Sequence, residues 1–113
     1  MYCAAPEVLS GMKHANSDVW SAGVILHIML VGFPPFRANN PLDLATKIKH
    51  EQLTFDTPEW AVVSPSARKL VQNMLMKDPS ERVSAKEAQN NNSWLLNLGP
   101  DSEKNEFKLP KKK

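Results

Sequence analysis

The sequence has little of several features that mark particular classes of protein. One cysteine in 113 residues cannot form a disulfide within the chain, which excludes a disulfide-stapled scaffold. The four glycines form no Gly-x-Gly pair, so the chain has no glycine-rich phosphate loop. Residues 1–100 hold nine basic and nine acidic side chains, and the net charge of +2 arises in residues 101–113. The body therefore offers no positive surface that would attract nucleic acid.

Long apolar runs are also scarce. The longest covers residues 19–31, with ten apolar residues in 13, between Asp18 and Gly32. A membrane span needs about 20 apolar residues, so we predict a buried core helix and expect no contact with a membrane. The N-terminus has no basic leader before an apolar stretch, and a single free cysteine suits a reducing compartment. We therefore expect a cytoplasmic protein.

The residues that are present predict helices joined by long, proline-containing loops. No segment shows the alternation of a β-strand, so we expect an all-α fold of about four helices without a sheet. The first helix is predicted to begin at Ser17 or Asp18, whose side chains can cap the first turn, and to stop at Gly32. The second is predicted to begin at Asn40, with Pro41 at its first position, and to reach about residue 51.

Two further helices are predicted nearer to the C-terminus. Ser64 is expected to cap the third, which has the spacing of a one-sided helix and which Asp78-Pro79 should end. The sequence Ser84-Ala85-Lys86-Glu87 predicts a capping box at the start of the fourth, and Asn90-Asn91-Asn92-Ser93 should stop it. Residues 53–63 are predicted to be irregular. Three residues are expected to anchor that loop: Phe55, Pro58 and Trp60.

The first helix has no polar face. Its apolar residues surround the helix axis, which is typical of a helix in the middle of a large protein. Three other helices and some loops are too few to cover it, so we expect that part of the domain is missing or that a partner binds there. Trp94-Leu95-Leu96 should return to the core, whereas residues 97–113 are polar and charged and are predicted to be a disordered tail.

Four blocks of sequence form a series with characteristic spacing. They are Ala5-Pro6-Glu7; residues 17–26; Gly32-Phe33-Pro34-Pro35-Phe36; and Leu75 with Asp78-Pro79 and Arg82, followed by Ser84-Ala85. In this order they resemble the C-terminal portion of a eukaryotic serine/threonine protein kinase domain, in the calcium/calmodulin-dependent and calcium-dependent group. The resemblance implies a helical C-lobe fragment, with residues 1–96 as a partial kinase domain from the end of the activation segment onward.

The resemblance also implies roles for individual residues. Glu7 would pair with Arg82 through two parallel hydrogen bonds and join the end of the activation segment to the helical lobe. Asp18 would accept hydrogen bonds from backbone N–H groups of a catalytic loop, unless it only caps its own helix, and Trp20 would be a packing residue. The chain has cysteine at a position where the family usually has tyrosine. Three residues would belong to the pocket that reads the substrate residue after the phosphorylated one: Tyr2, Cys3 and Ala4.

The sequence lacks the elements that carry out phosphoryl transfer. It has no glycine-rich loop, no Val-Ala-Ile-Lys, no His-Arg-Asp and no Asp-Phe-Gly. Its three histidines do not share metal-ligand spacing with Cys3. We therefore expect no catalytic, cofactor-binding or metal-binding residue here and no activity from the chain alone. The resemblance implies that ATP and Mg²⁺ bind an intact parent protein.

Two functions remain open at this point. In the first, the chain supplies the helical scaffold and part of the substrate-docking surface of a kinase that phosphorylates Ser or Thr of protein substrates. Its partners would be those substrates or the remaining kinase lobe. In the second, the chain is a non-catalytic, kinase-derived interaction module, with a docking surface formed by residues 42–51 and by the loop that carries Phe33 and Phe36.

Overall fold

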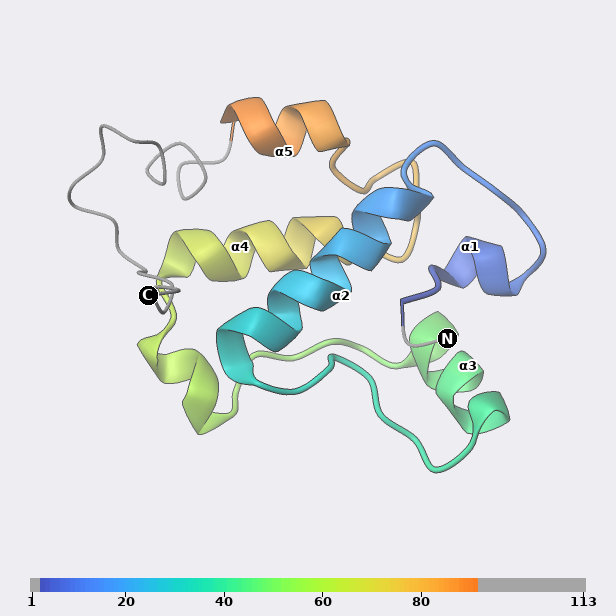
Figure 1. Ribbon diagram of the computed structural model, residues 1–113, viewed down its shortest axis with the longest axis horizontal. Helices are drawn as coiled ribbons and strands as arrows, with labels where there is room; N and C mark the ends of the chain where they lie inside the picture. Colours follow the sequence, from blue (N-terminus) through green and yellow to red (C-terminus); the bar gives the residue numbers. More distant parts are fainter. Residues whose placement is uncertain (1–2, 92–113) are drawn as a thin grey trace, which may run out of the picture.

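The computed structural model describes residues 3–91. Within that range there are five α-helices, one 3-10 helix and no strand, which confirms the all-α prediction with one α-helix more than expected. Figure 1 shows α2 crossing the middle of the molecule. Helix α4 lies to its left with α5 above, and α1 and α3 lie to its right. In chain order the elements are α1 (Pro6–Leu9), α2 (Ser17–Val31), α3 (Pro41–His50), η1 (Pro58–Val62), α4 (Pro65–Met74) and α5 (Ala85–Asn91).

Three predicted helix starts are confirmed by their capping bonds. The side chains of Asn40 at α3 and Ser64 at α4 each accept a hydrogen bond from the backbone N–H three residues later, at 2.8 and 3.2 Å. At α5 the predicted capping box is present. The Ser84 hydroxyl accepts from the Glu87 N–H at 3.1 Å, and the Ser84 N–H donates to Glu87 Oε1 at 2.9 Å. Local sequence therefore specifies where these helices begin.

Helix α2 begins at Ser17, as predicted, but it lacks the predicted side-chain cap. Its N-cap is Asn16, and no side chain caps the helix. The Ser17 hydroxyl accepts from the His14 N–H at 3.2 Å and donates to Glu7 at 2.7 Å, while Asp18 is exposed. Capping by Ser17 or Asp18 is therefore wrong, because the hydroxyl is engaged by a neighbouring segment instead of by its own first turn.

The ends of α2 and α4 have different causes. Gly32 ends α2 as predicted, with a φ of +93° that glycine adopts without strain and with its N–H donating four residues back at 2.7 Å. Helix α4 ends at Met74, so the predicted end at Asp78-Pro79 is wrong. The Asn73 carbonyl, which a longer helix would use, accepts instead from the Val83 N–H at 3.3 Å. A tertiary contact thus shortens α4.

Two short helices were not predicted. Helix α1 is too short to show periodicity, and its local signals are Pro6 at the first position and Glu7 in the first turn. The 3-10 helix η1 lies within the stretch predicted to be irregular. Trp60 is buried there, and Phe55 lies edge-on to it with ring centroids 4.8 Å apart. Pro58 is exposed and opens η1, so its predicted anchoring role is wrong.

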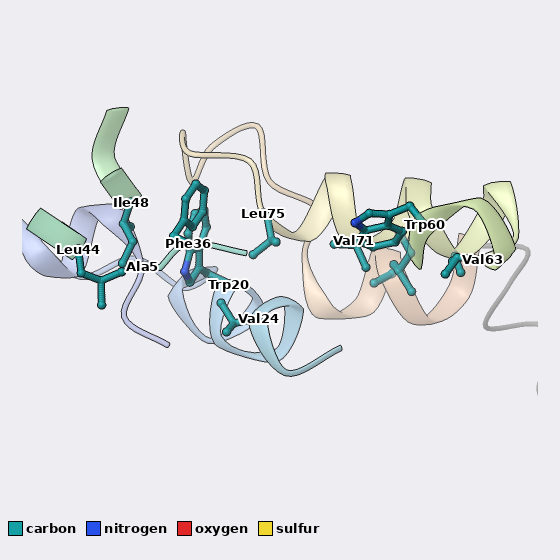
Figure 2. Packing of buried hydrophobic residues seen from close by; sticks show 13 residues of the cluster. Ala5, Trp20, Val24, Phe36, Leu44, Ile48, Trp60, Val63, Val71 and Leu75 are labelled. Carbon is teal, nitrogen blue, oxygen red and sulfur yellow. The ribbon is translucent and has the colours of Figure 1, made fainter. Parts of the chain in front are cut away.

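The buried core joins α2 to the elements around it. Figure 2 shows Trp20 beside Phe36, with Val24 one turn further along α2. Gly23 allows α2 and α4 to approach closely, because a Cβ at that position would lie 2.9 Å from the Met74 Cβ. The buried cluster consists of Ala5, Trp20, Val24, Phe36, Leu44, Ile48, Trp60, Val63, Ala67, Leu70, Val71, Leu75 and Ala88.

One face of α2 is not covered by the described residues. Ala22, Ile25, Ile28 and Met29 are exposed, and the exposed fractions of Ile25 and Met29 are 51% and 54%. This uncovered apolar face agrees with the expectation that the first helix needs further neighbours. Across residues 3–91, every helix is too short or too polar to span a bilayer. The predicted return of Trp94-Leu95-Leu96 to the core and the predicted disordered tail lie outside the described residues.

Candidate functional site

Arg82 is buried, with 2% of its surface exposed, and all five N–H donors of its guanidinium have partners. Two bonds reach the Glu7 carboxylate, from Nη1 to Oε2 at 2.8 Å and from Nη2 to Oε1 at 2.9 Å. The other three reach the carbonyl oxygens of Asn16, Met76 and Lys77, at 2.9, 2.8 and 3.3 Å. A buried charge is tolerated when it is paired and fully hydrogen-bonded, and this arrangement meets both conditions.

The Glu7 carboxylate completes the ion pair. It also accepts a hydrogen bond from the Ser17 hydroxyl at 2.7 Å, and its side chain is only 9% exposed. The hydrogen bonds from Arg82 lower the pKa of Glu7 from 4.5 to about 2; burial opposes this shift, and the bond from Ser17 adds to it. Glu7 is therefore ionised at neutral pH. The predicted contact between Glu7 and Arg82 is present in the structure.

Asn16 and Ser17 belong to the same cluster, although the sequence did not identify them as members. The Asn16 side-chain amide donates to the carbonyl oxygens of Pro79 and Arg82, at 3.1 and 3.3 Å. A polar residue just before an apolar helix is also the signal for an N-cap, so the sequence could not separate the two roles. We call Glu7, Asn16, Ser17 and Arg82 the clamp. It joins α1, the start of α2 and the loop before α5.

An aromatic stack connects the clamp to α3. The rings of Trp20 and Phe36 lie parallel, with centroids 6.2 Å apart and an interplanar angle of 5°. Arg82 Cζ lies 5.2 Å from the Trp20 ring centroid, and Lys77 Nζ lies 4.5 Å from that of Phe36. Lys77 Nζ also donates to the Ile48 carbonyl in α3 at 2.6 Å, and burial lowers the pKa of Lys77. Trp20 thus has the packing role that the resemblance implies.

The segment predicted to read the substrate lies along α2. Cys3 and Ala4 are half-buried, and Tyr2 lies outside the described residues. The Ser21 hydroxyl donates to the Cys3 carbonyl at 2.6 Å, and Ala5 is buried in the core. The structure therefore holds Cys3 against α2. The substrate-binding role of Tyr2, Cys3 and Ala4 stays a prediction.

Two polar groups of α2 lack partners within residues 3–91. The Trp20 Nε1–H is buried and has no hydrogen-bond acceptor there. The Asp18 carboxylate is exposed on the same face as Ala22 and Ile25, with no hydrogen bond to the described residues. Because buried N–H groups are almost always hydrogen-bonded, the Trp20 indole is an exception among the described residues.

The titratable His, Cys, Asp and Glu side chains of the described residues are not gathered into a cluster. Between residues 3 and 91, no three side chains of His, Cys, Asp or Glu are grouped as metal ligands would be. His27 is buried between Phe33 and Trp60, and its Nδ1 lies 2.8 Å from the Phe33 carbonyl oxygen. Burial lowers the pKa of His27, which suits a neutral core residue.

Comparison with known proteins decides the family. The model of the protein kinase domain matches residues 1–95. The chain belongs to the protein kinase family. Calcium-dependent protein kinase 24 from Oryza sativa subsp. japonica is 46% identical over 86 residues, which cover 76% of this chain and 17% of that relative. Calcium-dependent protein kinase 4 from Plasmodium berghei (strain Anka) is 41% identical over 87 residues, covering 77% of this chain and 16% of that relative.

A further relative shows that the similarity extends beyond the proteins named as calcium-dependent. MAP kinase-activated protein kinase 2 from Cricetulus longicaudatus is 39% identical over 100 residues, covering 84% of this chain and 30% of that relative. The chain thus spans well under half the length of the curated relatives it matches. It corresponds to part of a protein kinase domain similar to the calcium-dependent group, as the sequence resemblance implied.

Proposed function

We propose that this chain forms part of the helical, substrate-docking region of a serine/threonine protein kinase. The intact kinase would use ATP and Mg²⁺ to phosphorylate Ser or Thr residues of protein substrates. The observation that carries the proposal is the clamp, in which all five donors of buried Arg82 are bonded and two of them reach Glu7. Such a clamp fixes α1 against α2 and so supports a substrate pocket in the segment just before α1.

The uncovered face of α2 supports a partner supplied by the rest of the kinase domain. Ile25 and Met29 are more than half exposed, and Asp18 lies on the same face. An apolar face of this kind in a water-soluble helix marks a contact surface. A neighbour with apolar side chains and backbone N–H groups would cover Ile25 and Met29 and donate hydrogen bonds to the Asp18 carboxylate.

The role we propose for this chain is positioning, without chemistry. Glu7 and Arg82 are engaged with each other and cannot act on a substrate, and His27 is buried in the core. The residues of the chain hold the substrate segment and provide the scaffold, while nucleotide binding and phosphoryl transfer belong to other parts of the kinase. We also propose a cytoplasmic location, which the free thiol of Cys3 supports.

The alternative of a non-catalytic docking module loses part of its proposed surface. Phe36 is 4% exposed and stacks on Trp20, so it cannot present itself to a partner. The loop that carries Phe33 and Phe36 instead joins α2 to α3 and contributes to the core.

A chimera tests the proposal. Residues 1–96 would replace the matching segment of calcium-dependent protein kinase 24 from Oryza sativa, and phosphate transfer from ATP to a peptide would be measured. We expect the chimera to be active and the purified 113-residue chain to be inactive. The variant Arg82→Met, which removes the clamp, should inactivate the chimera. A folded but inactive chimera, or phosphate transfer by the 113-residue chain alone, would contradict the proposal.

A further inference from the structure

Two serine hydroxyls on one face of α2 bind residues 3–7, the segment that leads into α1 and includes its first turn. Ser17 donates to Glu7 Oε2 at 2.7 Å, and Ser21 donates to the Cys3 carbonyl oxygen at 2.6 Å. Residues four apart in a helix lie on the same face, one turn from each other. The segment from Cys3 to Glu7 is therefore attached to α2 at both of its ends, with buried Ala5 between them.

The two attachments differ in what they fix. Glu7 is already held by two hydrogen bonds from Arg82, so Ser17 adds a third bond to a carboxylate whose position is determined. The Ser21 hydroxyl donates to the main-chain carbonyl of Cys3, and this hydrogen bond holds the Cys3 end of the segment. It therefore fixes the orientation of the peptide unit that follows Cys3.

A serine within a helix usually bonds to water or to a carbonyl of its own preceding turn. The Ser21 hydroxyl instead points across to another segment, and its 2.6 Å bond lies at the short end of the range for hydroxyl donors. The helix does not require this bond, because alanine has a higher helix propensity than serine. The hydroxyl is thus directed at the Cys3 segment.

We infer that Ser21 is a positioning residue for Cys3 and Ala4 in the segment proposed to read the substrate. The inference rests on the proposed kinase function for the meaning of that segment, although the hydrogen bond can be tested without it. Removing the hydroxyl should free the Cys3 carbonyl and let the segment depart from α2, while the clamp continues to hold Glu7.

Cys3 is a suitable reporter because it is the one cysteine of the sequence and is half-buried. The rate of its alkylation by iodoacetamide would be measured in the 113-residue chain with Ser21 and in Ser21→Ala. We expect the variant to react on the order of fivefold faster, since one neutral hydrogen bond shifts such an equilibrium by about that factor. Ser10→Ala is the control, because Ser10 is exposed and its hydroxyl makes no hydrogen bond within the described residues.

A second pair of variants isolates the hydroxyl from side-chain shape. Ser21→Thr keeps the hydroxyl donor. Ser21→Val has nearly the shape of threonine but no hydroxyl. The thiol should react at the rate of the unchanged chain with Thr and faster with Val. Equal alkylation rates for Ser21, Ala and Val would overturn the inference. Loss of the helical circular dichroism spectrum in all three variants would also overturn it, because Ser21 would then be required for folding.

The chimera separates this inference from the proposed function. In an active chimera, Ser21→Ala should raise the KM for the peptide several-fold and leave the KM for ATP unchanged, and Ser21→Thr should restore the peptide KM. An unchanged peptide KM would refute the positioning role while the kinase proposal stands. If the chimera with Ser21 is folded but inactive, the kinase proposal fails, and the alkylation rates still decide whether Ser21 holds the segment.

Discussion

The substitution Glu7→Gln tests how much the Glu7–Arg82 ion pair of the clamp contributes to the stability of the folded chain. Glutamine keeps the shape of the side chain but removes the charge that faces buried Arg82, and it places an amide NH₂ where one carboxylate oxygen accepts. Leaving one partner of a buried ion pair uncompensated costs about 3–5 kcal/mol. The lowered pKa of Glu7 leads to a similar free energy. A shift of the Glu7 pKa from 4.5 to about 2 corresponds to roughly 3 kcal/mol of free energy of unfolding.

The direction of the pH dependence follows from the same shift. Because the pKa of Glu7 is lower in the folded state, the unfolded chain takes up the proton first as the pH falls. The stabilisation is complete above pH 4.5 and is lost progressively as the pH falls to about 2. The Glu7→Gln variant lacks this titration. The difference in stability between the two proteins should therefore be large at pH 7 and shrink below pH 4.5.

Urea unfolding followed by circular dichroism at pH 7, 5 and 3 measures this difference. A loss of about 3 kcal/mol would be a large part of the stability of a domain of this size, at about 0.05–0.15 kcal/mol per residue. The control is Glu59→Gln, at an exposed glutamate of η1, which should change stability by about 0.5 kcal/mol or less. A Glu7→Gln loss below about 1 kcal/mol at pH 7, or an equal loss at pH 3 and pH 7, would refute the reasoning.

Three further measurements test other parts of the structure. Gly23→Ala should destabilise the chain by about 1–3 kcal/mol in urea, because its Cβ would lie 2.9 Å from that of Met74 on α4; a stabilised variant would contradict the close approach. Replacing the exposed apolar residues Ile25 by Asp and Met29 by Lys should roughly halve the fluorescence of a bound apolar dye and reduce self-association. The helical circular dichroism should stay unchanged. Unchanged dye binding would contradict the assignment of this face of α2 as the exposed apolar surface that binds the dye. NMR titration of His27 should give a midpoint below pH 6.5, because burial disfavours the charged imidazole. The contribution of neutral His27 to stability is therefore complete above pH 6.5 and is lost as the pH falls below that value. A midpoint at or above 6.5 would contradict the burial of His27.

The sequence predicted the features that depend on a few neighbouring residues. Asn40, Ser64 and Ser84 begin helices where expected, because a capping bond closes within three residues, and Gly32 ends α2 through a backbone conformation that glycine favours. The apolar circumference of residues 19–31 also predicted a helix with an uncovered face. That prediction needed only the helical period and the small number of other elements available.

The family resemblance identified Glu7 and Arg82, but the remaining members of the site could not be read from spacing. Arg82 binds a carboxylate 75 residues away and a carbonyl 66 residues away. Main-chain carbonyls carry no residue-specific signal, so no pattern identifies which of them a guanidinium will reach. The end of α4 at Met74 has the same origin, since its cause is a bond from Val83 to Asn73.

The sequence by itself thus determined four of the five α-helices in residues 3–91, and that one of them has an apolar face that needs further neighbours. Only the tertiary structure decided which side-chain hydroxyl or amide hydrogen-bonds to another segment and does not cap its own helix. Ser17 and Ser21 bond to Glu7 and Cys3 because α2 and the preceding segment lie within 3 Å of each other at those atoms. Such bonds depend on where distant parts of the chain meet, and that is fixed by the packing of the whole core.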